Sequence, residues 1–156
     1  MNQVTLREYR PGDAEAMYAL DLLCFEPPFR FSRRAMRSFA EQRGAMTVLA
    51  EADGELVGFS IAHREGDWSY VVTLDVAPAW RRRGLARQLM EQLEAQARAA
   101  GSLGMTLHVY AGNAGAIRFY EELGYSRAGR AENFYGRGKD ALVYRKDLGA
   151  FPIRAG

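Results

Sequence analysis

The sequence is poor in cysteine, in histidine and in long apolar runs. Its single cysteine, Cys24, excludes an internal disulfide, and its two histidines have no partners at the spacing of a metal-ligand set. No apolar run approaches the roughly 20 residues that span a bilayer, and no cationic segment followed by an apolar run resembles a secretory signal. We therefore expect a protein without a metal, neither exported nor membrane-bound, in the cytoplasm.

An excess of charge of one sign is also lacking. Lys and Arg number 21 against 19 Asp and Glu, so the formal net charge of +2 does not indicate nucleic acid binding. Nineteen of the cations are Arg, and they cluster at residues 30–37 and 81–87, which favours local contacts to anions. The 156 residues are 48% hydrophobic, which predicts one domain over residues 1–148 followed by a loose tail at residues 149–156.

Seven segments have the character of β-strands. Two apolar runs flank Asp53-Gly54, a strong hairpin signal, and a long alternating run precedes Pro78. The expected strands are Val4–Tyr9, Met46–Ala52, Leu56–Arg64, Trp68–Val76, Met105–Tyr110, Tyr125–Gly129 and Ala141–Lys146.

Four segments carry helical periodicity or capping signals. We expect helices over Asp13–Phe25 with Asp13 as N-cap, Ser32–Glu41 with Ser32 as cap, Gly84–Ala100, and Asn113–Leu123. Residues 68–110 then form a strand–helix–strand unit, whose right-handed crossover makes its two strands parallel. The order of elements predicts an α/β (α+β) fold, a mixed sheet of about seven strands with helices on both faces.

The segment Arg81-Arg82-Arg83-Gly84-Leu85-Ala86 lies between the end of an expected strand and the start of an expected helix. The first N–H groups of a helix lack intrahelical partners, and the helix dipole is positive at that end. Gly84 and Ala86 allow a phosphate to approach the backbone, so this junction predicts an anion site of the kind that holds a pyrophosphate.

The stretch V-A-P-A-W-R-R-R-G-L-A-R-Q-L-M resembles the acetyl-CoA motif of the GNAT N-acetyltransferase superfamily, [QR]-x-x-G-x-[GA]. Downstream, L-H-V-Y-A-G-N-A-G-A-I-R-F-Y-E-E-L-G-Y is similar to the part of that fold in which an Asn begins a helix and a Tyr follows seven residues later. The resemblance implies a GNAT fold with a βαβ acetyl-CoA-binding core and acetyl-CoA as cosubstrate. The implied cofactor-binding residues are Leu74, Val76, Arg81, Arg82, Arg83, Gly84, Leu85, Ala86, Arg87, Asn113, Ala116 and Tyr120.

Within that superfamily, the chain resembles RimI-like protein N-terminal acetyltransferases and their eukaryotic catalytic-subunit relatives. C-F-E-P-P-F is similar to their loop between the first two helices, and E-N-F-Y is similar to their late N-Y-Y loop. Both loops grip a peptide N-terminus in these relatives. The resemblance therefore implies a protein or peptide N-terminus as the partner, including a ribosomal protein, and Phe25, Pro28, Phe29 and Tyr135 as substrate-binding residues.

Acetyl transfer to an amine needs a neutral nucleophile, which requires a base. An α-amino group has a pKa of roughly 7.7 to 8.0, so a modest base suffices near neutral pH. A histidine such as His108 has an ordinary pKa in a range suitable for this base. Strand alternation places His108 on one face with Thr106 and Tyr110. Some eukaryotic relatives carry a His here and a Tyr at the position of Tyr70, whereas bacterial RimI-type enzymes carry a Glu. The resemblance leaves His108 and Tyr70 as alternative bases.

The leaving thiolate needs a proton and the thioester carbonyl must be polarised. Tyr120 is the expected general acid, because a phenol is protonated at neutral pH. By resemblance, a backbone N–H in the segment Leu74–Val76, chiefly that of Val76, faces the thioester oxygen. An acyl-cysteine relay through Cys24 is disfavoured, because Cys24 falls on the apolar stripe of its helix.

Two other functions remain open from the residues. The acceptor can instead be a small amine, although the two acceptor loops carry only Glu26 and Glu132 as acids, with several arginines nearby. The chain can also be a catalytically weak acyl-CoA-binding module, which the presence of Tyr120 and His108 argues against. The oligomeric state is not predicted.

Overall fold

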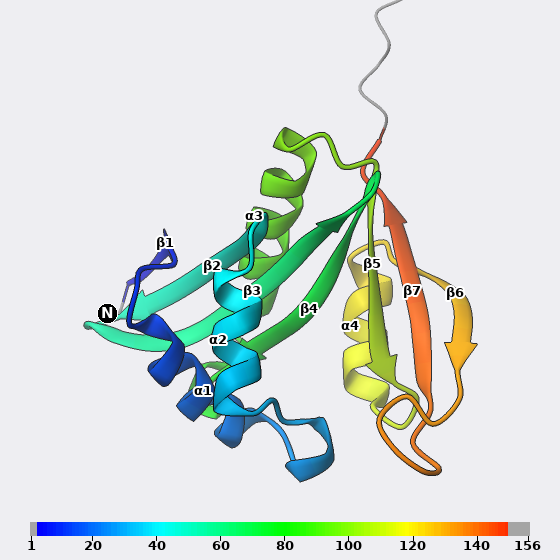
Figure 1. The fold of residues 1–156 in the computed structure, drawn as a ribbon, viewed down its shortest axis with the longest axis horizontal. Helices are drawn as coiled ribbons and strands as arrows, with labels where there is room; N and C mark the ends of the chain where they lie inside the picture. The colour runs from blue at the N-terminus through cyan, green and yellow to red at the C-terminus, as the bar shows by residue number, and fades with distance from the viewer. Residues whose placement is uncertain (1–2, 150–156) are drawn as a thin grey trace, which may run out of the picture. The chain divides into compact units, whose positions relative to one another are not determined.

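A computed structural model describes residues 3–149. Its strands are β1 Val4–Glu8, β2 Ala45–Ala52, β3 Glu55–Glu65, β4 Trp68–Val76, β5 Gly104–Tyr110, β6 Ser126–Ala131 and β7 Ala141–Asp147. Its helices are α1 Asp13–Cys24, α2 Arg33–Glu41, α3 Leu85–Ala99 and α4 Ala114–Glu122, with short 3₁₀ turns η1 Pro27–Phe29 and η2 Pro78–Trp80 (Figure 1). The hydrogen-bonded strand order is β1-β2-β3-β4-β5-β7-β6. All expected strands and helices are confirmed, with ends that differ by a few residues at most, whereas the expected tail lies outside the described residues except for Gly149.

The chain forms two compact units. The first comprises Met1–His63 and Val72–Gln96, and the second comprises Arg64–Val71 and Ala97–Gly156, so β3, β4 and α3 each contribute to both. The expectation of one domain over residues 1–148 stays a prediction. In the second unit, β4 and β5 pair in parallel from Trp68 opposite Gly104, as the strand–helix–strand order predicts.

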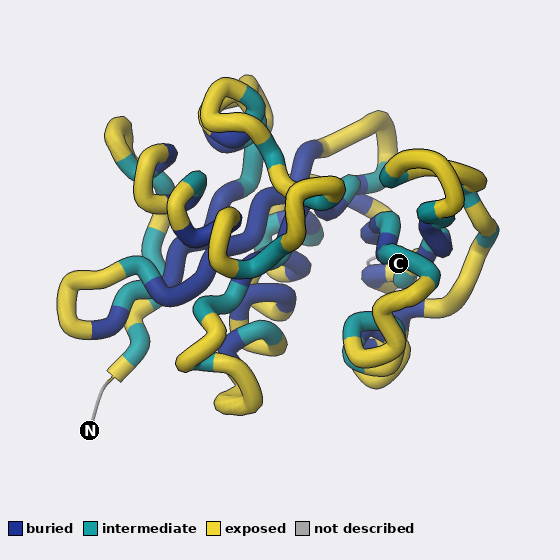
Figure 2. Tube along the Cα trace, turned by 90° about the horizontal axis from the view of Figure 1, so that it is seen from below, coloured by how far each residue is buried: buried dark blue, intermediate teal, exposed yellow. Residues whose placement is uncertain are grey.

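The first unit has helices on both faces of its strands. Helices α1 and α2 cover one face of β2 and β3 and lie in front of these strands in Figure 1. The buried core between them consists of Met17, Leu20, Met36, Ala40, Leu49, Phe59 and Ile61. Gly58 alternates with Phe59 and therefore faces the other side. A Cβ at Gly58 would lie 3.1 Å from Leu89 and 3.2 Å from Leu85, which places α3 on that opposite face. The buried stretches of the tube in Figure 2 are interrupted by exposed turns.

The backbone conformation of the turn between β2 and β3 explains why these two strands form a hairpin. Asp53 and Gly54 both have positive φ angles, 54° and 78°, which is the backbone of the two-residue turn that matches strand twist. The register then runs from Ala52 opposite Glu55, with a bulge at Ala50 and Glu51. The local sequence therefore sets the pairing of these strands.

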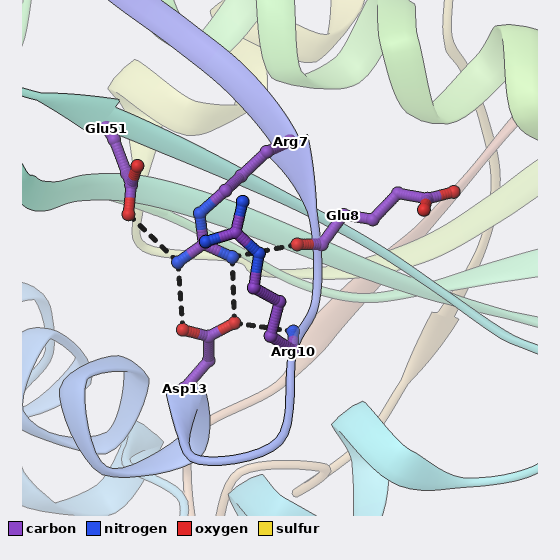
Figure 3. Close-up of polar contacts among 5 residues, drawn as sticks. All are labelled: Arg7, Glu8, Arg10, Asp13 and Glu51. Atoms are coloured by element: carbon purple, nitrogen blue, oxygen red, sulfur yellow. Dashed lines mark hydrogen bonds and ion pairs between the residues drawn. The ribbon is translucent and has the colours of Figure 1, made fainter.

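The start of α1 corrects one expectation. Asp13 is the first helical residue and the N-cap is Gly12, so the prediction of Asp13 as N-cap is wrong. The carboxylate of Asp13 instead accepts two hydrogen bonds from Arg7, at 2.9 and 2.8 Å, and one from the backbone N–H of Arg10 at 2.6 Å (Figure 3). Arg7 also forms an ion pair with Glu51 at 2.9 Å. A guanidinium group from β1 thus takes the carboxylate that a helix cap would use.

The two faces of β5 differ in the second unit. Met105, Leu107 and Val109 are buried, and Leu107 lies opposite Tyr144, whose hydroxyl donates to Glu121 of α4 at 2.7 Å. These contacts place α4 on the apolar face, so the alternate residues of β5 face away from it. None of the helices within residues 3–149 is long and apolar enough to cross a membrane.

Candidate active site

The arginine-rich junction lies in the first unit, where the sequence predicts it. β4 ends at Val76 and α3 begins at Leu85, after the turn η2 and an exposed segment, residues 81–84. Gly84 has a φ of 79°, and Arg82 has a φ of 64°, a left-handed conformation that is uncommon for a residue with a side chain. The first helical bond runs from the N–H of Gln88 to the oxygen of Gly84 at 3.1 Å, so the three preceding N–H groups have no acceptor within the helix.

The arginine side chains of this junction have partners of their own. The guanidinium of Arg81 donates to the carbonyl oxygen of Val76 at 3.2 Å, and that of Arg83 lies over the ring of Trp80 at 4.7 Å. Arg87 forms an ion pair of 3.7 Å with Glu91 one turn along α3. Their charge remains near the helix start, while the N–H groups remain for an anion. Leu85 and Ala86 can contribute only backbone groups to such a site.

Two donors hold the carbonyl oxygen of Val76 at the end of β4. Besides Arg81, the thiol of Cys24 donates to this oxygen at 3.3 Å. Burial raises the pKa of the Cys24 thiol to about 11. The thiol is therefore protonated at neutral pH, which makes it a structural donor and a poor nucleophile. Leu74 lies two residues earlier in β4, and the role expected of the Val76 N–H stays a prediction.

Tyr70 and His108 meet in the second unit. Tyr70 lies opposite Thr106 in the parallel pair, so the side chain of His108, two residues further along β5, lies on the same face. The hydroxyl oxygen of Tyr70 is 2.8 Å from Nδ1 of His108. Burial raises the pKa of Tyr70 to about 12 and lowers the pKa of His108 below its ordinary value. At neutral pH the phenol is protonated and the imidazole is neutral.

Phe134 covers the imidazole of His108. The two rings are stacked with centroids 4.0 Å apart and planes 5° from parallel, although Phe134 is 47% exposed. Sequence reasoning missed Phe134 and selected its neighbour Tyr135, whose ring lies edge-on to Tyr110 with centroids 6.2 Å apart. The motif E-N-F-Y contains both aromatics, and only the backbone conformation decides which one reaches the histidine.

The loop that carries Phe134 is held by polar contacts. Asn133 has a φ of 54°, its side-chain oxygen accepts from the N–H of Gly138 at 2.8 Å, and its own N–H donates to Asp140 at 2.9 Å. Asp140 also accepts from Arg130 at 2.9 Å, and these donors lower its pKa. Burial raises the pKa of Tyr135, so its hydroxyl is protonated. A loop built this way presents its aromatic side chains in a fixed orientation.

The helix expected to complete the cofactor site is α4. Asn113 is its N-cap, and the side-chain oxygen of Asn113 accepts from the N–H of Ala116 at 3.0 Å. Tyr120, seven residues after Asn113, is 9% exposed and contacts the rings of Phe119 and Tyr125. The three expected residues do share one helix, and capping occupies the Asn113 oxygen.

The loop between α1 and α2 belongs to the first unit and is also fixed. Phe25 and Phe29 are half-buried and Pro28 is exposed, with the prolines held in η1. The guanidinium of Arg30 donates to the carbonyl oxygens of Phe25, at 2.7 Å, and Leu22, at 3.2 Å. Of the four expected substrate-binding residues, three therefore lie in this loop, and Tyr135 lies in the second unit.

Comparison with known proteins identifies the class. Residues 14–125 match the family described as the acetyltransferase (GNAT) family. The chain is 37% identical over 122 residues to the N-terminal acetyltransferase B complex catalytic subunit naa20 of Schizosaccharomyces pombe, covering 71% of this chain and 68% of that protein. It is 31% identical over 113 residues to the ribosomal protein bS18 alanine N-acetyltransferase of Escherichia coli K12, covering 69% and 76%.

The fold agrees with these relatives. The crystal structure of the ribosomal-protein-S18-alanine N-acetyltransferase from Escherichia coli superposes with a TM-score of 0.88 at 24% identity, covering 99% of both chains. Fold and relatives define an acetyl-CoA-dependent N-acetyltransferase. The chain belongs to the GNAT acetyltransferase family.

Proposed function

We propose that this enzyme acetylates the α-amino group of a protein or peptide N-terminus in the cytoplasm. The observation that carries the proposal is the hydrogen-bonded Tyr70–His108 pair with its lowered histidine pKa. An imidazole that is neutral at pH 7 suits an α-amine with a pKa of roughly 8 better than a lysine amine near 10.4. The names of the two relatives, an N-terminal acetyltransferase subunit and a ribosomal protein alanine acetyltransferase, support the same acceptor class and include a ribosomal protein among candidate partners.

The residues at the start of α3 fit a pyrophosphate. A Cβ at Gly84 would meet nothing within 4 Å, so the backbone there is open to a ligand. The N–H groups of residues 85–87 and the positive end of the helix dipole are suited to an anion. When bound, acetyl-CoA supplies a thioester whose acetyl group passes to the amine. We assign the phosphate contacts to the backbone of residues 82–87, with Asn113 and Ala116 as further cofactor-binding residues.

Tyr70 and His108 act together as the base. The raised pKa of Tyr70 makes the phenolate unavailable at neutral pH, so Tyr70 alone cannot accept a proton from the amine. It can relay one, because its oxygen takes the proton of the α-ammonium group while its own hydroxyl proton moves to Nδ1 of His108. The net proton then resides on the imidazole.

Tyr120 donates the proton that the leaving thiolate needs, and the N–H of Val76 polarises the carbonyl. A Tyr120→Phe variant retains the ring, and its contacts to Phe119 and Tyr125, while it loses the hydroxyl. We expect kcat to fall by about 100-fold or more with little change in the affinity for acetyl-CoA. A Phe119→Leu variant, which alters packing on the same helix, is the control.

The acceptor assignment is tested with two peptides of one sequence. One has a free N-terminus and no lysine, and the other has a blocked N-terminus and one internal lysine. We expect the first to be acetylated faster at pH 7, with Phe25, Pro28, Phe29 and Tyr135 contributing to its KM. Equal rates, or a faster rate on a small amine such as a polyamine, would contradict the assignment and leave the acetyltransferase class intact.

A further inference from the structure

Two aspartates are buried together in the first unit. Asp21, in the last turns of α1, and Asp75, at the end of β4, are both 0% exposed, and the interaction of Asp75 with Asp21 raises the pKa of Asp75. Carboxylates are rarely buried without a cation, and two ionised groups in contact repel each other strongly. None of the ion pairs found in the described part of the chain includes either residue. The charge of Arg81 acts on Asp75 but does not outweigh its burial beside Asp21, so the pair needs another source of stability.

A shared proton supplies it. Oδ2 of Asp21 accepts the N–H of Phe31 at 3.0 Å, and Oδ1 of Asp75 accepts the hydroxyl of Thr73 at 2.6 Å. The remaining oxygens, Oδ1 of Asp21 and Oδ2 of Asp75, are buried and have no hydrogen-bond partner among the described residues, so a proton placed between them would satisfy both atoms. Burial and the neighbouring Asp21 raise the pKa of Asp75 well above its usual value, which places the proton there. Asp75 then donates to the Asp21 carboxylate.

The pair joins two segments that the reaction uses. Asp21 holds the N–H of Phe31, the residue that closes the acceptor loop, defined here as residues 25–31. Asp75 directly precedes Val76, whose carbonyl oxygen is held by Cys24 from the same helix. Two parallel links thus connect the last turns of α1 to the end of β4, one through the shared proton and one through the thiol.

We propose that Asp21 and Asp75 are positioning residues, and that their shared-proton hydrogen bond fixes the acceptor loop at the end of β4 so that the incoming amine is held in register. The inference rests on the proposed role of this loop in acceptor binding. It does not depend on which amine is the acceptor. Neither aspartate touches substrate, and both act through the backbone that they hold.

The test compares Asp75→Asn with Asp75→Ala. An asparagine amide retains an oxygen for Thr73 and supplies an N–H to Asp21 without a shared proton, whereas alanine leaves the Asp21 carboxylate buried without its donor. We expect Asp75→Ala to raise the acceptor KM by about tenfold, with acetyl-CoA affinity and kcat nearly unchanged, and Asp75→Asn to restore the KM. Ser60→Ala, which removes another buried hydroxyl of the first unit, is the control for a general loss of buried polarity.

Infrared spectroscopy of the folded enzyme tests the proton itself. The carbonyl stretch of a protonated carboxyl group is expected in the wild type at neutral pH and is expected to vanish in Asp75→Asn. Thermal unfolding shows whether each variant is folded. If Asp75→Ala does not fold, the infrared band and the KM of Asp75→Asn still test the proposal. The kinetic assay uses whichever acceptor the amine and peptide panel identifies, so a wrong acceptor class does not affect it. A wild type without the band, an asparagine variant as impaired as alanine, or an equal loss of acetyl-CoA affinity would overturn the proposal.

Discussion

Removal of either member of the Tyr70–His108 pair should lower kcat/KM by as much as removal of both. The pair is joined by one hydrogen bond of 2.8 Å, and in the proposed relay both groups handle a single proton. Tyr70→Phe breaks the path from amine to imidazole, while His108→Ala removes the final acceptor. Once one of them is gone, the other has no role left in the transfer.

The expected magnitudes follow from this geometry. A general base contributes typically about 100- to 10,000-fold, so we expect each single variant to lose about 100-fold in kcat/KM at pH 7, or about 2.7 kcal/mol of transition-state stabilisation. Independent residues would give a product of about 10,000-fold in the double variant. A relay predicts a double variant that also loses only about 100-fold, and hence a coupling energy of about 2.7 kcal/mol.

Steady-state release of CoA over a range of peptide concentrations gives kcat/KM for the parent, the two single variants and the double variant. Tyr144→Phe is the matched control, because Tyr144 belongs to the same unit and loses a hydrogen bond of similar length to Glu121, on the other face of the sheet. Its kcat should be that of the parent. Additive losses in the double variant would refute the relay, and a fully active Tyr70→Phe would leave His108 as a base that acts alone.

Three further outcomes are expected. Gly84→Val should abolish acetyl-CoA binding in calorimetry. The control is Gly66→Val, at a turn glycine of similar φ and equally open surroundings, which should retain binding. Equal affinities of Gly84→Val and the parent for acetyl-CoA would place the phosphate site elsewhere. Phe134→Ala should expose the imidazole of His108 and raise its pKa, because burial lowers that pKa in the parent. The acid limb of the pH profile of kcat/KM should then move to higher pH. An acid limb at the same pH as in the parent would contradict the burial of His108 by Phe134. Arg7→Met should lower the free energy of unfolding at pH 7 by about 2 kcal/mol in urea titrations. Because Arg7 lowers the carboxyl pKa of its partner in α1, the difference from the parent should shrink as pH falls through that pKa, and a difference independent of pH would argue against the ion pair.

Local sequence signals predicted the elements because their causes are local. The Asp53-Gly54 turn needs two residues that tolerate positive φ, and Ser32 needs only its own hydroxyl to accept the N–H of Ala35 at 3.0 Å. Strand alternation likewise placed His108 on the face away from the apolar neighbours of its strand. Asp13 was misjudged because its partner, Arg7, comes from a different element and competes with the helix N-terminus for the carboxylate.

The parts that sequence could not predict depend on contacts between distant segments. Asp21 and Asp75 lie on a helix and a strand far apart in the sequence, and nothing in either segment indicates that they share a proton. The stacking of Phe134 on His108 depends on a loop whose conformation is set by Asn133. In both cases the chemistry of a group is decided by a neighbour that no local pattern specifies.

The excess of Arg over Lys has a physical reason within this chain. Carbonyl groups at the ends of helices and strands lack partners, and a guanidinium with several fixed donors can reach two of them at once. Arg30 does so for Leu22 and Phe25 after α1, and Arg81 holds the oxygen of Val76 after β4. Lysine, with one compact ammonium group, cannot bridge two carbonyls in this planar geometry.

This use of arginine changes the interpretation of the two arginine clusters, residues 30–37 and 81–87, which the sequence analysis assigned to contacts with anions. In the first cluster, Arg33 and Arg37 form ion pairs with Glu15 and Glu41, at 2.8 and 3.3 Å, so the anions that they contact belong to the chain itself. In the second cluster, most guanidinium groups are likewise engaged within the chain. Affinity for a phosphate at residues 82–87 must then depend mainly on backbone N–H groups and the helix dipole, which is why a glycine substitution there is a sharper test than the removal of any single arginine.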